Sequence, residues 1–270
     1  MPLNLARLKA QVTKEARLIE RIDRRFADDL EHVLFRLNTQ IRRLVRDLDT
    51  KGGRLVSTHA TLGRALRLRT ELTTAMDAAG YPALVNQTVA RGLDKLAETV
   101  LSGRSIAARA AQMTPLNLES LAALKDMRLA DLLQLGEQVS TTLWRTTVDG
   151  VLGFRPVPDL VDELAAVTDV SARQARTLHD TAVSTYGRSV DQIDLAGTNA
   201  ERFLYIGPDD DATRPFCQRY VDKVLTRGEI SELDNGQLPN VLLTAGGYNC
   251  RHKWQYIGSL DVDEVLADVA

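Results

Sequence analysis

The sequence predicts a mainly α-helical protein, with a long N-terminal helix, a helical middle and a small α+β module in its C-terminal part. Apolar residues recur every three or four positions through the first 48 residues, which is the spacing of one helix face. After residue 200, short apolar runs are separated by Gly, Pro and Asp, and this pattern is typical of strands and turns. Only 5% of the residues are aromatic, which favours a core of aliphatic side chains packed between helices.

The first helix is expected to be unusually long. Apolar residues from Leu8 to Leu48 follow steps of three and four, and from Ile19 onward these steps form an eleven-residue repeat. No Gly or Pro interrupts Leu3–Lys51, and Gly52-Gly53 is expected to end the helix. A helix of about 45 residues would span roughly 70 Å. It needs a partner, which is either the next helix folded back along it or another chain.

Two further helices are predicted before residue 102. One spans about Ser57–Ala79 and stops at Gly80-Tyr81-Pro82, because proline lacks an N–H and restricts the residue before it. The other spans about Pro82–Leu101. Ser105–Met113 is expected to be a linker or a short helix, and Pro115 to begin the next unit.

The middle of the chain is also predicted to be helical. Residues 117–150 form one or two helices, with Asn117 or Thr114 as the N-cap and Trp144 in the core. After a turn at residues 150–158, two helices follow at Asp159–Val167 and Ala172–Ser189, the second capped by Ser171. These boundaries divide the chain into a helical-hairpin region at 1–113, a helical middle with a hinge at 114–157, and a C-terminal domain at 158–270.

The C-terminal domain is expected to contain short strands and a helix. Phe203–Ile206 and Arg251–Ile257 have the composition of strands. Asp211 or Thr213 can cap a helix at Phe216–Leu225, whose first turn would begin with a proline.

Charge is distributed unevenly, although the whole chain has a formal net charge of −2. Residues 1–70 contain 16 Lys and Arg against 8 Asp and Glu, and the remainder has a net charge of −10. A basic segment can contact nucleic acid or an acidic protein surface, and the alternative is a solvated, Arg-rich helix face. The candidate nucleic-acid contacts are Arg42, Arg43, Arg46, Arg54, Arg64 and Arg67.

Neither a signal peptide nor a membrane span is expected. The N-terminus lacks an apolar segment of the kind that signal peptides contain, and the chain has no run of about 18 apolar residues. Its two cysteines do not make a disulfide framework and fit a protein made in a reducing compartment. We therefore expect no membrane partner.

Cys217, Cys250 and His252 are the candidate ligands of a structural metal ion. Zinc accepts two thiolates and an imidazole in a tetrahedral site, and a Cys-x-His pair on a strand points both side chains to one face. Cysteines buried as small apolar residues, or joined in a disulfide, are the alternatives. A Cys–His nucleophile is not expected, because positions i and i+2 of one strand seldom give the required contact. Candidates for the fourth ligand are Asp209, Asp210, Asp211 and His179.

A spaced motif covers the last third of the chain. Asp210, Thr213 and Cys217 precede a variable insert, and Asn249, Cys250 and Arg251 follow it. This order resembles the C-terminal motif of phage head morphogenesis proteins, the minor head proteins similar to the F protein of phage Mu. Their motif runs Asp-x-x-Thr-x-x-x-Cys, then a loop, then His-Pro-x-Cys-Arg-Cys. Two positions depart from it, since Gly247-Tyr248 stand in place of His-Pro and His252 in place of the last Cys.

The resemblance implies a structural minor head protein of a tailed phage or prophage, not an enzyme. Such a protein lies in the virion, inside the capsid near the portal vertex, and acts in head assembly or in DNA packaging and ejection. Its implied partners are the portal protein, the major capsid protein and double-stranded DNA, and it is expected to be oligomeric in the particle. The alternatives are a small zinc-containing enzyme or toxin-like domain acting on nucleic acid through Asp209–Asp211 or His252, and a plain helical adaptor.

Overall fold

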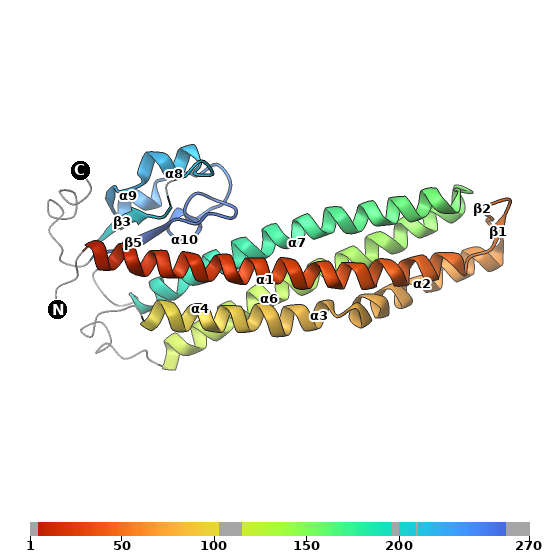
Figure 1. Ribbon diagram of the computed structural model, residues 1–270, viewed down its shortest axis with the longest axis horizontal. Coiled ribbons are helices and arrows are strands. Elements are labelled where there is room, and N and C mark those ends of the chain that lie inside the picture. Colours follow the sequence, from red (N-terminus) through yellow and green to blue (C-terminus); the bar gives the residue numbers. More distant parts are fainter. Residues whose placement is uncertain (1–4, 103–114, 196–199, 209, 258–270) are drawn as a thin grey trace. The chain divides into compact units, whose positions relative to one another are not determined.

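The computed structural model describes residues 5–102, 115–195, 200–208 and 210–257, which are mainly helical with a few short strands (Figure 1). The predicted fold class is therefore confirmed. The chain forms two compact units, each built from separate stretches of sequence. Unit 1 comprises Met1–Asp23, Arg91–Met127 and His179–Ala270, and unit 2 comprises Arg24–Ala90 and Arg128–Leu178. The division into consecutive domains at 1–113, 114–157 and 158–270 stays a prediction.

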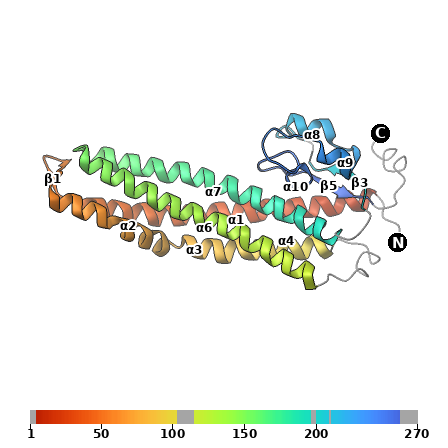
Figure 2. The same cartoon turned by 180° about the vertical axis from the view of Figure 1, so that it is seen from behind.

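Unit 2 is an antiparallel helical bundle whose segments run alongside α1 (Figure 2). Arg36 Nε donates to Ala79 O at 2.8 Å, and Thr88 Oγ1 donates to Asp29 at 2.9 Å. The chain after α1 therefore runs back along it, which confirms the fold-back partner of the long helix. Its elements lie within α1 (Leu5–Arg46), β1 (Thr50–Lys51), β2 (Arg54–Leu55), α2 (His59–Ala79), α3 (Tyr81–Ala83), the π-helix η1 (Leu84–Val89), α6 (Pro115–Leu152) and α7 (Val157–Asp194).

The first helix ends earlier than the sequence suggested. It stops at Arg46, and Gly52 and Gly53 form the turn of the β1–β2 hairpin. Their φ values of 59° and 75° are left-handed, which glycine adopts without steric cost and which a two-residue hairpin turn requires. The hairpin is held against the α6–α7 turn, since Leu55 N–H donates to Arg155 O at 2.9 Å.

Gly80 does end α2, with a left-handed φ of 96°. A helix restarts at Tyr81, because Pro82 suits a first turn. It continues through η1 into α4 (Ala90–Ser102), so the predicted helix at Pro82–Leu101 is confirmed, with a π-helical segment that no sequence pattern indicated.

Of the two candidate N-caps of α6, Asn117 is excluded, because the helix already begins at Pro115. Two other expectations in the middle of the chain are wrong. Trp144 is only partly buried, and the Arg69 guanidinium lies 5.6 Å from its ring. Ser171 does not begin a second helix, since α7 is continuous and Ser171 Oγ donates to Val167 O at 2.7 Å. Thr114 and Ser105–Met113 lie outside the described residues.

Unit 1 contains a three-stranded antiparallel sheet with the strand order β4-β3-β5. Its central strand alternates between two cores, because successive side chains point to opposite faces. Phe203 and Tyr205 pack into the core of the C-terminal module, and Leu204 and Ile206 pack against Leu8 and Val12 of α1. The sheet elements are β3 (Arg202–Ile206), β4 (Val224–Thr226) and β5 (Lys253–Tyr256), and the short helices are α8 (Pro215–Tyr220), α9 (Arg227–Ser231) and α10 (Val241–Thr244).

The predicted strands at Phe203–Ile206 and Arg251–Ile257 are confirmed as β3 and β5, although β5 covers only Lys253–Tyr256. The predicted helix Phe216–Leu225 is too long. It ends at Tyr220, and β4 then pairs with β3. Neither Asp211 nor Thr213 caps α8, because Arg214 occupies the N-cap position. None of the helices in the described residues combines the length and hydropathy needed to span a membrane.

We predict that Gly136→Ala destabilises unit 2. A Cβ at Gly136 would lie 2.7 Å from the buried ring of Tyr81, whose hydroxyl donates to Leu132 O at 2.9 Å. Overpacking of this kind costs about 1–3 kcal/mol, more than the roughly 1 kcal/mol by which alanine exceeds glycine in helix propensity. The free energy of unfolding in urea measures the change.

Gly63→Ala on α2 is the matched control. Its Cβ would have no neighbour closer than Arg67 at 3.6 Å, so we expect a gain of up to about 1 kcal/mol. Equal effects of the two substitutions would contradict the packing argument.

Candidate metal centre in the C-terminal module

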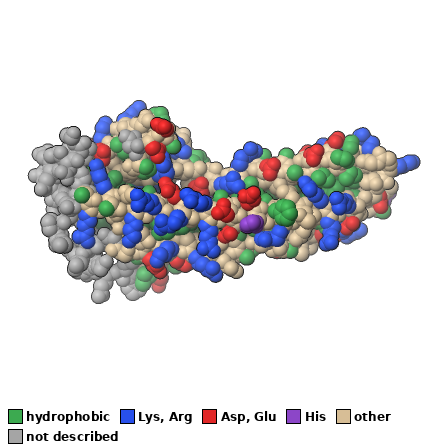
Figure 3. Space-filling model, viewed as in Figure 1, with side chains coloured by type: hydrophobic (Ala, Val, Ile, Leu, Met, Phe, Trp, Pro, Cys, Tyr) green, Lys and Arg blue, Asp and Glu red, His purple; other side chains and the backbone are tan. Residues whose placement is uncertain are grey.

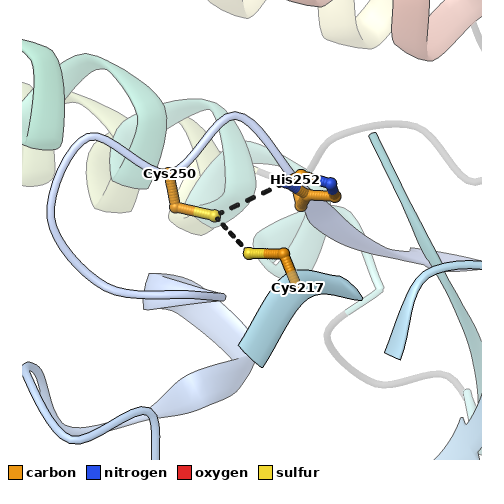
Figure 4. Close-up of side chains that lie close together, drawn as sticks. All are labelled: Cys217, Cys250 and His252. Atoms are coloured by element: carbon orange, nitrogen blue, oxygen red, sulfur yellow. Dashed lines mark hydrogen bonds between the residues drawn. The ribbon is translucent and has the colours of Figure 1, made fainter. Parts of the chain in front are cut away.

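Cys217, Cys250 and His252 lie together inside the C-terminal module (Figure 4). The two Sγ atoms are 3.7 Å apart, and Cys250 Sγ lies 3.9 Å from His252 Nδ1. All three side chains are buried, and both cysteines are free. Their donor atoms lie within 4.8 Å of one another. This cluster can hold a metal ion, so the predicted ligand set is brought together by the fold.

Local backbone geometry creates the cluster. Cys217 projects from α8, whose first turn is set by Pro215. Cys250 and His252 come from the loop before β5, which turns through Gly247 and Asn249 with left-handed φ values of 94° and 54°. Because residues 250–252 precede the strand, Cys250 and His252 come within hydrogen-bond reach, a contact that the strand spacing had not predicted.

Gly246 is required where the loop passes the sulfurs. A Cβ there would lie 2.4 Å from Cys217 Sγ and 3.2 Å from Cys250 Sγ. The Gly246 N–H donates to Cys250 Sγ at 3.2 Å. The absent side chain therefore leaves room for the two sulfurs.

The hydrogen bond between the two cysteines shifts their pKa values in opposite directions. The hydrogen bond from Cys217 lowers the pKa of Cys250, and His252 and the Arg188 charge act in the same direction against burial. The same hydrogen bond, together with burial, raises the pKa of Cys217. Thiolate is the form that binds metal, and Cys250 is the cysteine whose surroundings favour that form.

Arg188 of α7 fastens the loop that carries the ligands. Its guanidinium is buried and donates to His252 O at 2.9 Å, to Leu243 O at 3.0 Å and to Cys250 O. Burial lowers its pKa, and attraction to Cys250 and Tyr205 opposes that effect. Sequence reasoning missed Arg188, because nothing in the pattern of α7 distinguishes it from a solvated arginine.

Hydrogen bonds connect the first half of the motif, before the insert, to the second half, after it. The Arg251 guanidinium donates to both carboxylate oxygens of Asp210, at 2.8 and 2.5 Å. Thr213 Oγ1 accepts from Asp210 N–H at 2.9 Å and so closes the turn that presents this carboxylate. Asn249 contacts α7 instead, where Thr181 Oγ1 donates to its side-chain oxygen at 3.1 Å.

No known protein family, curated protein or solved structure matches the chain. The resemblance to phage head proteins therefore rests on the motif residues alone.

None of the described candidates for the fourth ligand joins the cluster. Asp210 is paired with Arg251, and Asp211 is exposed. Asp209 lies outside the described residues. His179 belongs to a second buried cluster, where its Nδ1 lies 3.0 Å from Asp180 and 3.5 Å from Asp23.

Most of the candidate nucleic-acid contacts are exposed side chains of unit 2. Arg42, Arg43, Arg46, Arg54 and Arg67 are exposed. Arg64 is partly buried and forms an ion pair with Glu71. Two of these residues stand in the last turn of α1, where a cation also interacts favourably with the helix dipole. On the visible face in Figure 3, basic side chains are interspersed with acidic ones.

We predict that Arg188→Met unfolds the C-terminal module. Two buried carbonyls and one partly buried carbonyl would lose their donor, at a cost of at least about 3 kcal/mol. Of the two tryptophans, Trp254 is buried in this module, so its fluorescence in a Trp144→Phe background reports the change. Arg173→Met removes an exposed arginine from the same helix, and we expect a change within about 0.5 kcal/mol. Similar losses in both variants would disprove the role of Arg188.

We also predict that Asp23 makes stability fall as pH rises from about 4 to about 8. Burial, with repulsion from Asp180 and Glu20, raises its pKa to about 8. The unfolded carboxyl titrates near about 3.9, so the native state binds more protons between these values and loses stability with rising pH. His179 acts oppositely but only below about 6.5, because burial lowers its pKa.

Asp23→Asn should therefore flatten the decline in melting temperature between about pH 6.5 and 8. Asp28→Asn, which removes an exposed charge from the same helix, is the control and should follow the wild-type curve. A decline of the same slope in Asp23→Asn would show that the carboxyl does not titrate there.

Proposed function

We propose that the chain is a structural minor head protein of a tailed phage or prophage, located inside the capsid near the portal vertex. In this role it acts in head assembly or in DNA packaging and ejection. Its partners are the portal protein or the major capsid protein, and it is oligomeric in the particle. The C-terminal module is the docking piece.

One observation carries this proposal: the motif shared with the head proteins closes the fold. Asp210 pairs with Arg251, and Cys217 lies 3.7 Å from Cys250, so each pair joins the segment before the insert to the segment after it. The sulfurs and His252 are buried. Residues used in this way give a rigid module, as a docking role requires.

Zinc is the metal that best suits the cluster. Zn–S and Zn–N bonds of about 2.3 and 2.0 Å place neighbouring ligand atoms of a tetrahedron roughly 3.5–3.8 Å apart. The distances of 3.7 and 3.9 Å from Cys250 Sγ to Cys217 Sγ and His252 Nδ1 fit this geometry. Cys217, Cys250 and His252 would hold the ion, whose role would be to fasten the insert to the module.

The alternative of a nucleic-acid enzyme receives less support. A catalytic metal would need Asp210 free, and this carboxylate accepts two hydrogen bonds from Arg251. The imidazole of His252 is only 3% exposed. Direct contact of the exposed arginines of unit 2 with double-stranded DNA is a separate part of the proposal. Full-length protein that fails to bind DNA even at low salt would disprove that part.

Mass spectrometry of purified particles tests the proposal. We expect the chain in particles of the phage that encodes it, at low copy relative to the major capsid protein. Comparison before and after DNA ejection then separates a protein that leaves with DNA from one that stays at the portal. Absence from particles that contain portal and capsid proteins would overturn the structural role.

Paired variants connect this result to the motif. Asp210→Ala should reduce incorporation into particles, because it leaves Arg251 without its carboxylate. Asp211→Ala removes the neighbouring exposed carboxylate and should have no effect. Hydrolysis of nucleic acid by the wild type that Asp211→Ala abolishes would instead favour the enzyme alternative.

A further inference from the structure

Tyr205 places a fourth donor atom beside the two sulfurs. It lies on β3 and is fully buried. Its hydroxyl oxygen is 3.3 Å from Cys217 Sγ and 3.8 Å from Cys250 Sγ. Both distances are close to the ligand–ligand separations of roughly 3.5 Å that a tetrahedral zinc with oxygen and sulfur ligands requires.

The ring of Tyr205 is held in place from several sides. It stacks on His252 with centroids 5.3 Å apart and an interplanar angle of 9°, and it lies 4.4 Å from Trp254. Its backbone is hydrogen-bonded in both directions, from its N–H to Lys223 O and from Asp222 N–H to its O, each at 2.9 Å. A donor positioned so firmly needs little reorganisation to bind an ion, which is the property of a preorganised site.

A bound ion would supply the charge that ionises Tyr205, because burial and the neighbouring cysteines raise the pKa of its hydroxyl. A divalent ion with two thiolates, one phenolate and a neutral imidazole has a net charge of −1. The buried Arg188 guanidinium interacts electrostatically with Cys250, Tyr205 and Cys217, and among the described residues its hydrogen bonds go to carbonyl oxygens. It therefore places a positive charge beside the anionic centre, which reduces the cost of burying it.

We propose that Tyr205 is the fourth ligand of the metal centre, completing a Cys₂-His-Tyr set for a zinc-type divalent ion. This inference rests on the proposed zinc site and not on the phage role. On binding, the ion replaces the thiol protons of Cys217 and Cys250 and the phenol proton of Tyr205, and all of these protons pass to solvent. Oxidation states do not change.

Ultraviolet difference spectroscopy tests the assignment. Zn²⁺ is titrated into the chelator-treated full-length protein, and the band of ionised tyrosine is followed at neutral pH. We expect wild type to ionise one tyrosine per zinc. Tyr205→Phe should lack the band and bind zinc about 10- to 100-fold more weakly, as loss of a supporting group does. Tyr220→Phe changes another ring of the same cluster, 6.5 Å from Tyr205, and should behave like wild type.

Each other outcome overturns the inference. Stoichiometric zinc without the tyrosine band would leave the zinc site intact and exclude Tyr205 as a ligand. No zinc binding by wild type would remove the metal centre altogether, while particle mass spectrometry would still decide the phage role. If chelation unfolds the protein, X-ray absorption of the zinc-loaded form decides, since Tyr205 predicts two sulfur and two lighter ligands, with the lighter shell altered in Tyr205→Phe.

Discussion

A buried guanidinium holds the candidate site together. Arg188 reaches from α7 to the carbonyl of Leu243 in α10 and to those of Cys250 and His252 in the loop before β5. Burying such a charge is expensive unless its donors are satisfied, and this cost makes the arrangement specific. A shift of the loop would break these hydrogen bonds and leave the carbonyl oxygens and the guanidinium without partners. The positions of the two ligands on the loop thus depend on one side chain of a helix far from them in sequence.

A second buried charge connects β5 to the helices of unit 1. Lys253 donates to Glu15 of α1 at 2.6 Å and to Asp191 of α7 at 2.8 Å. Coulombic attraction to both carboxylates outweighs burial and raises the pKa of Lys253. Removal of one member of a buried ion pair is strongly destabilising, although the pair adds little over an apolar contact. The triad therefore serves mainly to select the docking of β5 on α1 and α7.

Sequence patterns predicted the parts of the structure that depend on local interactions. The apolar period of α1, the stop at Gly80 and the strands at 203–206 and 251–257 follow from side-chain spacing and from glycine and proline chemistry. The site was predicted as far as its motif residues. Ser171 was wrongly predicted to be an N-cap. A serine hydroxyl can accept from an N–H group at the start of a helix, but here it donates to a carbonyl four residues earlier in the same helix. Arg188 and Tyr205 were missed because their roles exist only through tertiary contacts, although Tyr205 stands on the same face of β3 as Phe203.

The departures from the head-protein motif have physical explanations in this fold. At the position of the motif histidine, Gly247 has a φ of 94°, and a Cβ there would lie 2.4 Å from Gln237 Oε1. At the proline position, the Tyr248 N–H donates to that same oxygen at 3.0 Å, which proline could not do. The insert thus supplies Gln237 as a contact that requires a different dipeptide. At the last cysteine position, His252 keeps a metal-binding donor while removing one negative charge, which leaves room in the charge balance for a phenolate at Tyr205.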